Sequence, residues 1–328
     1  MKYYKNILKL VGKTPLVKIN VLNPNPIVNL YAKLENFNPS GSVKARVAVA
    51  MIEQAENDGT LTPEKIVIEP SSGNTGIALA MCCAVKGYAC EIVMPEHMSI
   101  ERRKIMVIYG AKVTLTPAEK GTDGAIDYVK EIVKKNPDKY FFPDQFSNKN
   151  NPLTHYNTTA QEIIDDTDGE IDYFISGMGT SGTLMGVSKK LKEFKPRIKI
   201  IAVEPEEDAS IPGLKSLHVS YVPEIYDESM ISEEIHVSRH DAEHATRMLA
   251  LQEGIFCGIS SGAAMHIAML KAKEIKRGTI VVLFPDSGVK YVSDPIFMPD
   301  KCLECAKICR VRTLLDLEYI KSIREWWS

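Results

Sequence analysis

Strand-like and helix-like segments alternate along almost the whole chain, and no other feature limits its possible folds as much. Short apolar runs predict strands at residues 66–68, 90–94, 112–115, 173–175, 199–203 and 279–284. Helical patterns are found at residues 76–86, 100–109, 125–135, 157–164, 183–194, 241–252 and 262–275. Because helices and short turns connect the strands, we expect an α/β protein with parallel sheets.

The length of the chain indicates more than one structural unit. A chain of 328 residues is long enough to divide into two lobes. Several prolines and asparagines fall within residues 136–152, which predicts an irregular crossing between the lobes. We expect a smaller, mobile lobe at residues 39–149, a larger lobe at 1–38 and 150–300, and a separate tail at 301–328.

Charge and composition narrow the classes of partner. A net charge of −2 gives no basic surface for nucleic acid, and no apolar run is long enough to cross a bilayer. The N-terminal segment lacks the apolar core and cleavage site of a signal peptide, so we expect a cytoplasmic protein. Seven cysteines, an odd number, do not resemble a secreted disulfide framework. A small molecule is the expected partner, with no nucleic acid and no membrane.

A polar turn directly follows the predicted strand at residues 66–68. The carboxyl end of a strand in a parallel sheet is where ligands bind. This turn precedes a helix and offers backbone N–H groups and several polar side chains, which are Ser71, Ser72, Asn74 and Thr75. Such donors suit a carboxylate, although an ordinary helix cap needs only one of them.

A glycine-rich turn at residues 177–183 directly follows the predicted strand at 173–175. Its glycines let the backbone approach phosphate oxygens at a helix N-terminus. The pattern is also a literal G-x-G-x-x-G, and Glu204 closes the next strand, so an NAD-dependent oxidoreductase is a rival interpretation. Two observations weigh against that rival. The motif lies in mid-chain, and its hydroxyl residues suit a terminal phosphate monoester.

Two further turns lie near the C-terminal end of the predicted sheet. After the strand at residues 279–284, Asp286 and Ser287 are expected at the same sheet edge, where either side chain can face a ring nitrogen. The small residues of 258–262 allow close approach to a flat ligand. Tight packing alone explains this second turn equally well.

Lys44 is the residue that suggests one cofactor for all of these turns. Pro39, Ser40 and Gly41 end an extended run, and a helix is predicted from about Ser42, so Lys44 falls in a first helical turn. The partial positive charge at a helix N-terminus disfavours an ammonium there and eases its deprotonation, as a Schiff-base lysine requires. A lysine, a carboxylate loop, a phosphate loop and a ring-nitrogen partner together are the parts that hold pyridoxal phosphate.

Six strings carry a family resemblance in register from Gly12 to about Ser293. The strings NPSGSVKAR, EPSSGNTGIALA, NPLTHYNTTAQEI, GMGTSGT, GISSGAA and LFPDSG resemble the cysteine synthase and cystathionine β-synthase family of pyridoxal-phosphate enzymes, of fold type II. The resemblance implies a tryptophan synthase β-like fold. Each of two lobes then holds a twisted, mostly parallel sheet flanked by helices, and the cofactor binds between them. It also implies a homodimer.

The resemblance also implies a role for each matching residue. Lys44 would be the Schiff-base lysine and the general base at the substrate Cα. The cofactor contacts would be Lys44, Asn74, Gly177, Gly179, Thr180, Ser181, Gly182, Thr183 and Ser287. The substrate contacts would be Ser71, Ser72, Gly73, Thr75, Gln145 and Gly258. A hydroxyl from Ser287 at the ring nitrogen would leave that nitrogen unprotonated and favour elimination.

The reaction implied is a β-replacement on a serine- or cysteine-derived amino acid through an aminoacrylate. Sulfide or a thiol adds, and cysteine made from O-acetylserine or a similar donor is the expected product. The alternatives are a cystathionine β-synthase-like enzyme and a cysteine-consuming enzyme that releases hydrogen sulfide or forms lanthionine. A small-molecule sensor on the same fold also stays open.

Three features depart from the family pattern. Ala45 stands where the family has an aspartate, and the segment at residues 211–223 is longer and more polar than the usual glycine-rich entrance, which leaves the second substrate open. The tail carries a C-x2-C-x3-C pattern made of Cys302, Cys305 and Cys309. This pattern suits zinc or an iron–sulfur cluster, whereas a reduced amphipathic helix or a redox disulfide explains it without metal.

Overall fold

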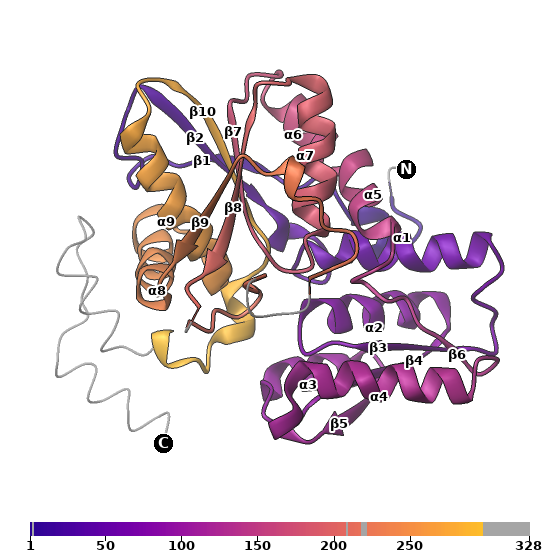
Figure 1. Ribbon diagram of the computed structural model, residues 1–328. Coiled ribbons are helices and arrows are strands. Elements are labelled where there is room, and N and C mark those ends of the chain that lie inside the picture. Colours follow the sequence, from indigo (N-terminus) through magenta and orange to yellow (C-terminus); the bar gives the residue numbers. More distant parts are fainter. Residues whose placement is uncertain (2, 208, 218–221, 298–328) are drawn as a thin grey trace.

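The structure is a computed structural model, and it describes residues 1, 3–207, 209–217 and 222–297. Two separate sheets form the framework (Figure 1). The smaller sheet has the order β5-β4-β3-β6 and is parallel throughout. Its strands are β3 (Ile66–Pro70), β4 (Ala89–Pro95), β5 (Lys112–Thr116) and β6 (Tyr140–Phe141). Its helices are α1 (Lys44–Asn57), α2 (Asn74–Lys86), α3 (Ile100–Ile108) and α4 (Gly121–Lys135).

The larger sheet has the order β1-β2-β10-β7-β8-β9, and only the β1–β2 pair is antiparallel. Its strands are β1 (Leu16–Lys18), β2 (Val28–Leu34), β7 (Tyr173–Gly177), β8 (Lys199–Pro205), β9 (Glu233–Val237) and β10 (Gly278–Phe284). Its helices are α5 (Asn150–Asn157), α6 (Thr159–Asp166), α7 (Gly182–Phe194), α8 (Arg239–Met248) and α9 (Ile259–Glu274). The predicted α/β class with two mostly parallel sheets is confirmed.

Alternating side chains explain why helices cover both faces of each sheet. In β10, Ile280 and Val282 join the apolar cluster under α8 and α9, whereas Val281 joins the cluster under α6 and α7. In the smaller sheet, Ile92 packs in the cluster with α1 and α2, while Val93 packs with α4. Successive residues of a strand point to opposite faces, so a run of consecutive apolar residues forms a strand buried on both sides.

The structure differs from the sequence prediction mainly at the edges of the elements. The helix predicted at residues 157–164 corresponds to α6, which begins after Thr158 leaves the helical backbone region, whereas α5 was not predicted and begins within the stretch at 136–152 that was expected to be irregular. The helix predicted at residues 241–252 is α-helical only as far as Met248, the last residue of α8. A short π-helical turn, Leu249–Glu253, follows it. The predicted lobe boundaries at residues 39 and 149, and the mobility of the smaller lobe, stay predictions. The tail at residues 301–328 lies outside the described residues.

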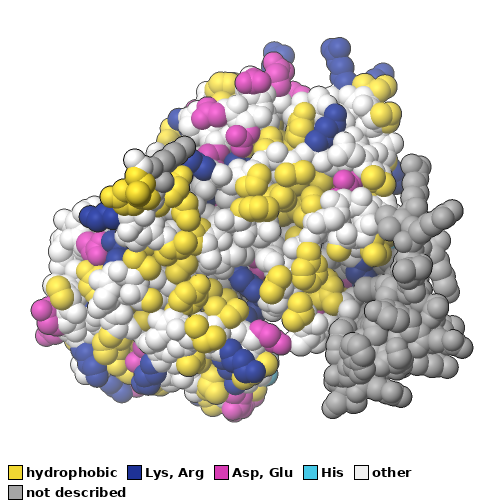
Figure 2. All heavy atoms as spheres, turned by 180° about the vertical axis from the view of Figure 1, so that it is seen from behind, with side chains coloured by type: hydrophobic (Ala, Val, Ile, Leu, Met, Phe, Trp, Pro, Cys, Tyr) yellow, Lys and Arg dark blue, Asp and Glu magenta, His cyan; other side chains and the backbone are white. Residues whose placement is uncertain are grey.

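Surface and helix properties add two observations. On the face shown in Figure 2, acidic and basic side chains are interspersed, with apolar areas between them. Within the described ranges, no helix combines the length and the apolar character needed to cross a bilayer.

Candidate active site

Most of the residues predicted from the sequence to form the site line a cavity of about 500 Å³. Among the residues that line it are Lys44, Ser71, Ser72, Gly73, Asn74, Thr75, Gln145, Gly179 and Thr180. A second, smaller cavity also borders Lys44 and is lined by Gly177, Gly179, Thr180, Ser181 and Thr183. The predicted carboxylate loop comes from the smaller sheet and the predicted phosphate loop from the larger sheet, and both lie at carboxyl ends of strands, as the parallel topology requires.

Lys44 is the first residue of α1, and its turn is attached to the larger sheet. The backbone N–H of Val43 donates to the carbonyl of Pro285 (2.8 Å), just after β10. Lys44 is half-buried, and desolvation lowers the pKa of its amine to about 8, against the opposing influence of Asp286 and Glu35. Burial is therefore the main cause of the lowered pKa, and not the helix N-terminus that the sequence suggested. A lysine with this pKa is partly neutral near physiological pH and can act as a nucleophile or base.

The carboxylate loop is shaped by its own hydrogen bonds. The Ser71 hydroxyl accepts from the backbone N–H of Gly76 (3.0 Å), so it also orders the start of α2. The Thr75 hydroxyl donates to Gln145 Oε1 (2.6 Å), which joins this loop to the crossing segment. The backbone carbonyl of Ser72 accepts from Arg102 of α3 (3.1 Å). Four predicted substrate contacts thus form one connected wall.

The phosphate loop has the features of an anion cradle. A Cβ on Gly182 would lie 1.9 Å from Asn151 Oδ1, and one on Gly179 would lie 2.9 Å from the carbonyl of Gly213, so neither position has room for a side chain. Ser181 has a positive φ of 62° directly before α7, and its buried hydroxyl has no hydrogen-bond partner within the described part of the chain. Close packing therefore accounts for these two glycines, whereas the available hydroxyl and the N-terminus of a long helix fit a phosphate group.

Two predicted contacts do not lie on the cavity wall, and one residue there was missed. Ser287 does not line either cavity, and its hydroxyl accepts from the backbone N–H of Val289 (3.2 Å) at the start of a short helix. Gly258 is also absent from the wall, where a Cβ would collide with Asp286 Oδ1 at 2.1 Å, so close packing accounts for this glycine. Ser260 lines the cleft instead, from the first turn of α9, and is 2% exposed. The signal for Ser260 was present in the GISSGAA string, which the sequence argument used only for its small size.

Asp286, the other residue considered for the ring nitrogen, has different partners. Its buried carboxylate accepts from the Asn74 amide (2.8 Å) and from the Tyr291 hydroxyl (2.7 Å). The carboxylate therefore organises the wall behind Asn74.

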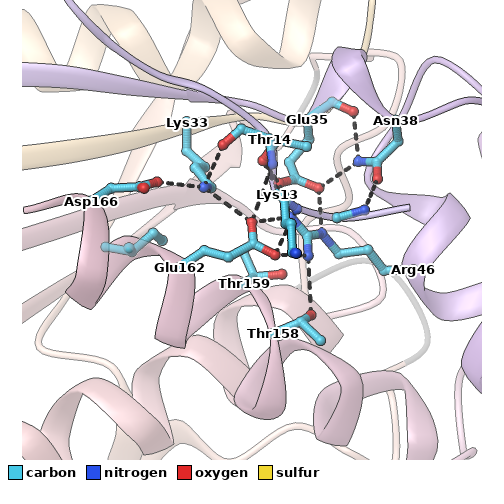
Figure 3. A network of polar contacts seen from close by, with 12 residues as sticks. Lys13, Thr14, Lys33, Glu35, Asn38, Arg46, Thr158, Thr159, Glu162 and Asp166 are labelled. Atoms are coloured by element: carbon cyan, nitrogen blue, oxygen red, sulfur yellow. Dashed lines mark hydrogen bonds and ion pairs between the residues drawn. The ribbon is translucent and has the colours of Figure 1, made fainter. Parts of the chain in front are cut away.

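A largely buried ionic network, with Asp166 at its exposed edge, anchors the helix that carries Lys44 (Figure 3). Arg46 donates to both oxygens of Glu35 (2.8 Å each) and to both oxygens of Glu162 (2.6 and 2.7 Å). Lys33 reaches Glu162 (3.1 Å) and Asp166 (2.8 Å). Lys44 is two residues before Arg46 in the same helix. The network therefore fixes the position of Lys44 relative to β2 and α6. Ala45 is buried in the apolar cluster of the smaller lobe, so this departure from the family pattern is accommodated as a core residue.

The divergent segment at residues 211–223 forms part of the cavity wall, although residues 218–221 lie outside the described ranges. Lys215 lies over the ring of Phe146, with Nζ 4.4 Å from the ring centroid. Burial lowers the pKa of Lys215. The segment therefore places a cation and an aromatic ring together at the cleft.

Comparison with known proteins agrees with this geometry. The family model described as "Pyridoxal-phosphate dependent enzyme" matches residues 7–286. Cysteine synthase B of Escherichia coli strain K12 is 43% identical over 287 residues, which cover 88% of this chain and 94% of that protein. The crystal structure of cysteine synthase from Entamoeba histolytica is similar, with a TM-score of 0.86 and 40% identity, covering 95% of this chain and 97% of that one. A hydrogen sulfide-producing enzyme from Fusobacterium nucleatum has a TM-score of 0.84 and 43% identity, covering 88% and 100%.

Proposed function

The chain belongs to the family of pyridoxal-phosphate dependent enzymes, and on this premise we propose that it makes cysteine by β-replacement. The donor would be O-acetylserine or a similar serine derivative, and sulfide would be the nucleophile. The observation that carries the proposal is the position of Lys44, whose pKa is lowered to about 8, between the carboxylate loop and the phosphate loop. The relatives named as cysteine synthases support this choice of product.

Different loops of the cleft would bind different groups of the cofactor and the substrate. The glycines and hydroxyls of residues 177–183 would hold the cofactor phosphate, and the loop of Ser71, Ser72 and Thr75 would hold the substrate carboxylate. When bound, pyridoxal phosphate supplies an electron-withdrawing ring that stabilises negative charge at the substrate Cα. Lys44, neutral in part near physiological pH, would remove the Cα proton and later return it.

The hydroxyl beside the cofactor ring is proposed to be that of Ser260. Ser260 lines the cleft, whereas Ser287 lines neither cavity. A hydroxyl does not stabilise a protonated ring nitrogen as a carboxylate would, so this environment favours loss of a β-substituent over transamination.

A second candidate differs only in the sulfur chemistry. Lys215 at the cleft suits a nucleophile or donor with its own carboxylate, such as homocysteine or cysteine. The relative from Fusobacterium nucleatum is described as hydrogen sulfide-producing. Under this alternative the enzyme would form cystathionine or lanthionine, or release hydrogen sulfide from cysteine.

A donor and nucleophile panel distinguishes the two candidates. The purified enzyme with pyridoxal phosphate is given O-acetylserine, O-phosphoserine, serine or cysteine, each with sulfide or with homocysteine, and products are separated by chromatography. We expect cysteine from O-acetylserine and sulfide at the highest kcat/KM. Faster sulfide release from cysteine would favour the alternative, and cofactor binding without turnover of any pair would favour a sensor.

We further propose a homodimer in the cytoplasm. The homodimer follows from the family resemblance, and light scattering during size-exclusion chromatography tests it. The location is supported by the free, buried thiols of the described residues, which suit a reducing compartment and are Cys82, Cys83, Cys90 and Cys257.

A further inference from the structure

Lys290 is a second buried lysine on the wall of the same cleft. It lies in the short helix Gly288–Tyr291 after β10 and is 6% exposed. Its ammonium donates to Asn74 Oδ1 (2.6 Å) and to the carbonyl of Gly41 (3.0 Å), and both acceptors are uncharged. Burial lowers the pKa of Lys290 to about 8, and the nearby Asp286 carboxylate opposes this shift without forming an ion pair with Lys290 among the described residues. Burying an ammonium against two uncharged acceptors is costly, and one of these acceptors, Asn74, also lines the cleft.

Asn74 is held from both sides by groups of opposite charge. Its Oδ1 accepts from Lys290, and its Nδ2 donates to Asp286 Oδ2 (2.8 Å). An ammonium can only donate and a carboxylate can only accept. If the amide turned over, its NH₂ would face the ammonium and its oxygen would face the carboxylate. The two contacts therefore allow one orientation of the amide.

We propose that Lys290 is a positioning residue that fixes the Asn74 amide so that it offers an N–H donor to the cofactor. The inference rests on the proposed role of Asn74 as a contact to the ring oxygen of pyridoxal phosphate. An anionic ring oxygen needs a donor, and the reversed amide would present a carbonyl to it instead. Asn74 lines the cleft, where the donor is required.

Lys290 also connects the two halves of the cleft. Gly41 belongs to the turn before Lys44 and Asn74 begins α2, whereas Lys290 follows β10 of the larger sheet. A Cβ on Gly41 would lie 3.4 Å from Lys290 Cε, so the lysine stem packs directly on that turn. One ammonium thus holds both the turn that precedes Lys44 and the amide that faces the cofactor.

A double-mutant cycle tests whether Lys290 acts through Asn74. The dissociation constant of pyridoxal phosphate is measured by absorbance and fluorescence for apo wild type, Lys290→Met, Asn74→Ala and the double variant. We expect Lys290→Met to weaken binding about 10-fold, as loss of a charged hydrogen bond does. In the Asn74→Ala background the same change should add less than about 2-fold, because coupled residues are not additive. Lys290→Arg should restore part of the affinity, since a guanidinium also only donates.

The matched control is Lys271→Met. Lys271 is another buried lysine, but it is paired with Glu233 (2.8 Å) and Glu274 (2.7 Å). It lies near the C-terminal end of α9, about 18 Å along the helix axis from Ile259, the first residue of that helix. This variant should lower the Tm without changing cofactor affinity. If Lys290→Met does not fold, the cycle is repeated with Lys290→Gln, whose amide can also accept and so no longer fixes Asn74.

If a folded Lys290 variant bound pyridoxal phosphate as tightly as wild type, the inference would be overturned. It would also be overturned if the Lys290 substitution weakened binding equally in wild type and in Asn74→Ala. Failure of wild type to bind pyridoxal phosphate would instead refute the proposed role of the whole site. The two failures are therefore distinguishable.

Discussion

Lys44 combines a covalent role with a position that removes part of its charge. An amine must be neutral to capture the cofactor, and desolvation lowers the pKa of Lys44 to about 8. The rate of covalent capture by the apoprotein should therefore rise about tenfold per pH unit below pH 8 and level off above it. Stopped-flow absorbance at several pH values measures this rate. A rate that kept rising beyond pH 10 would show an ordinary exposed lysine.

Matched aspartate substitutions at Ser260 and Ser287 test which of the two hydroxyls lies beside the cofactor ring nitrogen. Ser260→Asp places a carboxylate on the cleft wall, where it would favour a protonated ring nitrogen. We expect β-replacement to fall at least about 10-fold and the visible spectrum of the bound cofactor to change. Ser287→Asp should have little effect, since aspartate can also accept from the Val289 N–H. The opposite pattern would return Ser287 to the site.

At the scale of elements, the network around Arg46 joins α1, α6 and the end of β2. Burial raises the pKa of Glu162, but the bonds from Arg46 outweigh this and lower the pKa to about 2. A carboxyl with a depressed pKa stabilises the fold above its unfolded pKa of about 4.3, and this contribution is lost as the pH falls toward 2. Glu162→Gln should cost about 3 kcal/mol at neutral pH and much less near pH 2. Thermal unfolding across this pH range measures the difference, and an equal loss at every pH would contradict it.

We expect the segment at residues 211–223 to select the second substrate, because part of it lines the cleft. Replacing residues 215–221 with a short Gly/Ala loop removes Lys215 and its contact with Phe146. We expect the preference between sulfide and a carboxylate-bearing thiol to change at least about 10-fold, while loss of the leaving group changes little. Single-turnover measurements separate the two steps. Equal losses in both would make the segment merely structural.

Central strands were predictable from sequence, and edge elements were not. The run at 280–284 is apolar throughout because both faces of β10 are buried. By contrast, β9 alternates exposed and half-buried residues, and β6 has only two residues, so neither gives a strong apolar signal. Lys290 was missed because nothing in a single lysine indicates burial. Its contacts with Gly41 and Asn74 join residues that are 249 and 216 positions apart.

The whole molecule consists of two sheets that place their strand ends around one cleft. The smaller sheet supplies the carboxylate loop and the larger sheet supplies the phosphate loop, while Lys44 borders both cavities. Neither sheet alone supplies both loops. The cysteines of the tail, Cys302, Cys305 and Cys309, lie outside the described residues, and metal binding there stays a prediction.

We propose that Lys44 is essential for pyridoxal-phosphate-dependent β-replacement in this cleft. The most direct test of this proposal compares wild type with Lys44→Ala in one experiment. Both proteins are incubated with pyridoxal phosphate, O-acetylserine and sulfide, while cysteine formation and the visible spectrum are recorded. Wild type should be yellow and produce cysteine, and the variant should be folded, lack the absorbance of covalently held cofactor and lose at least about 1,000-fold in turnover. A variant that kept both the absorbance and the turnover would contradict the account.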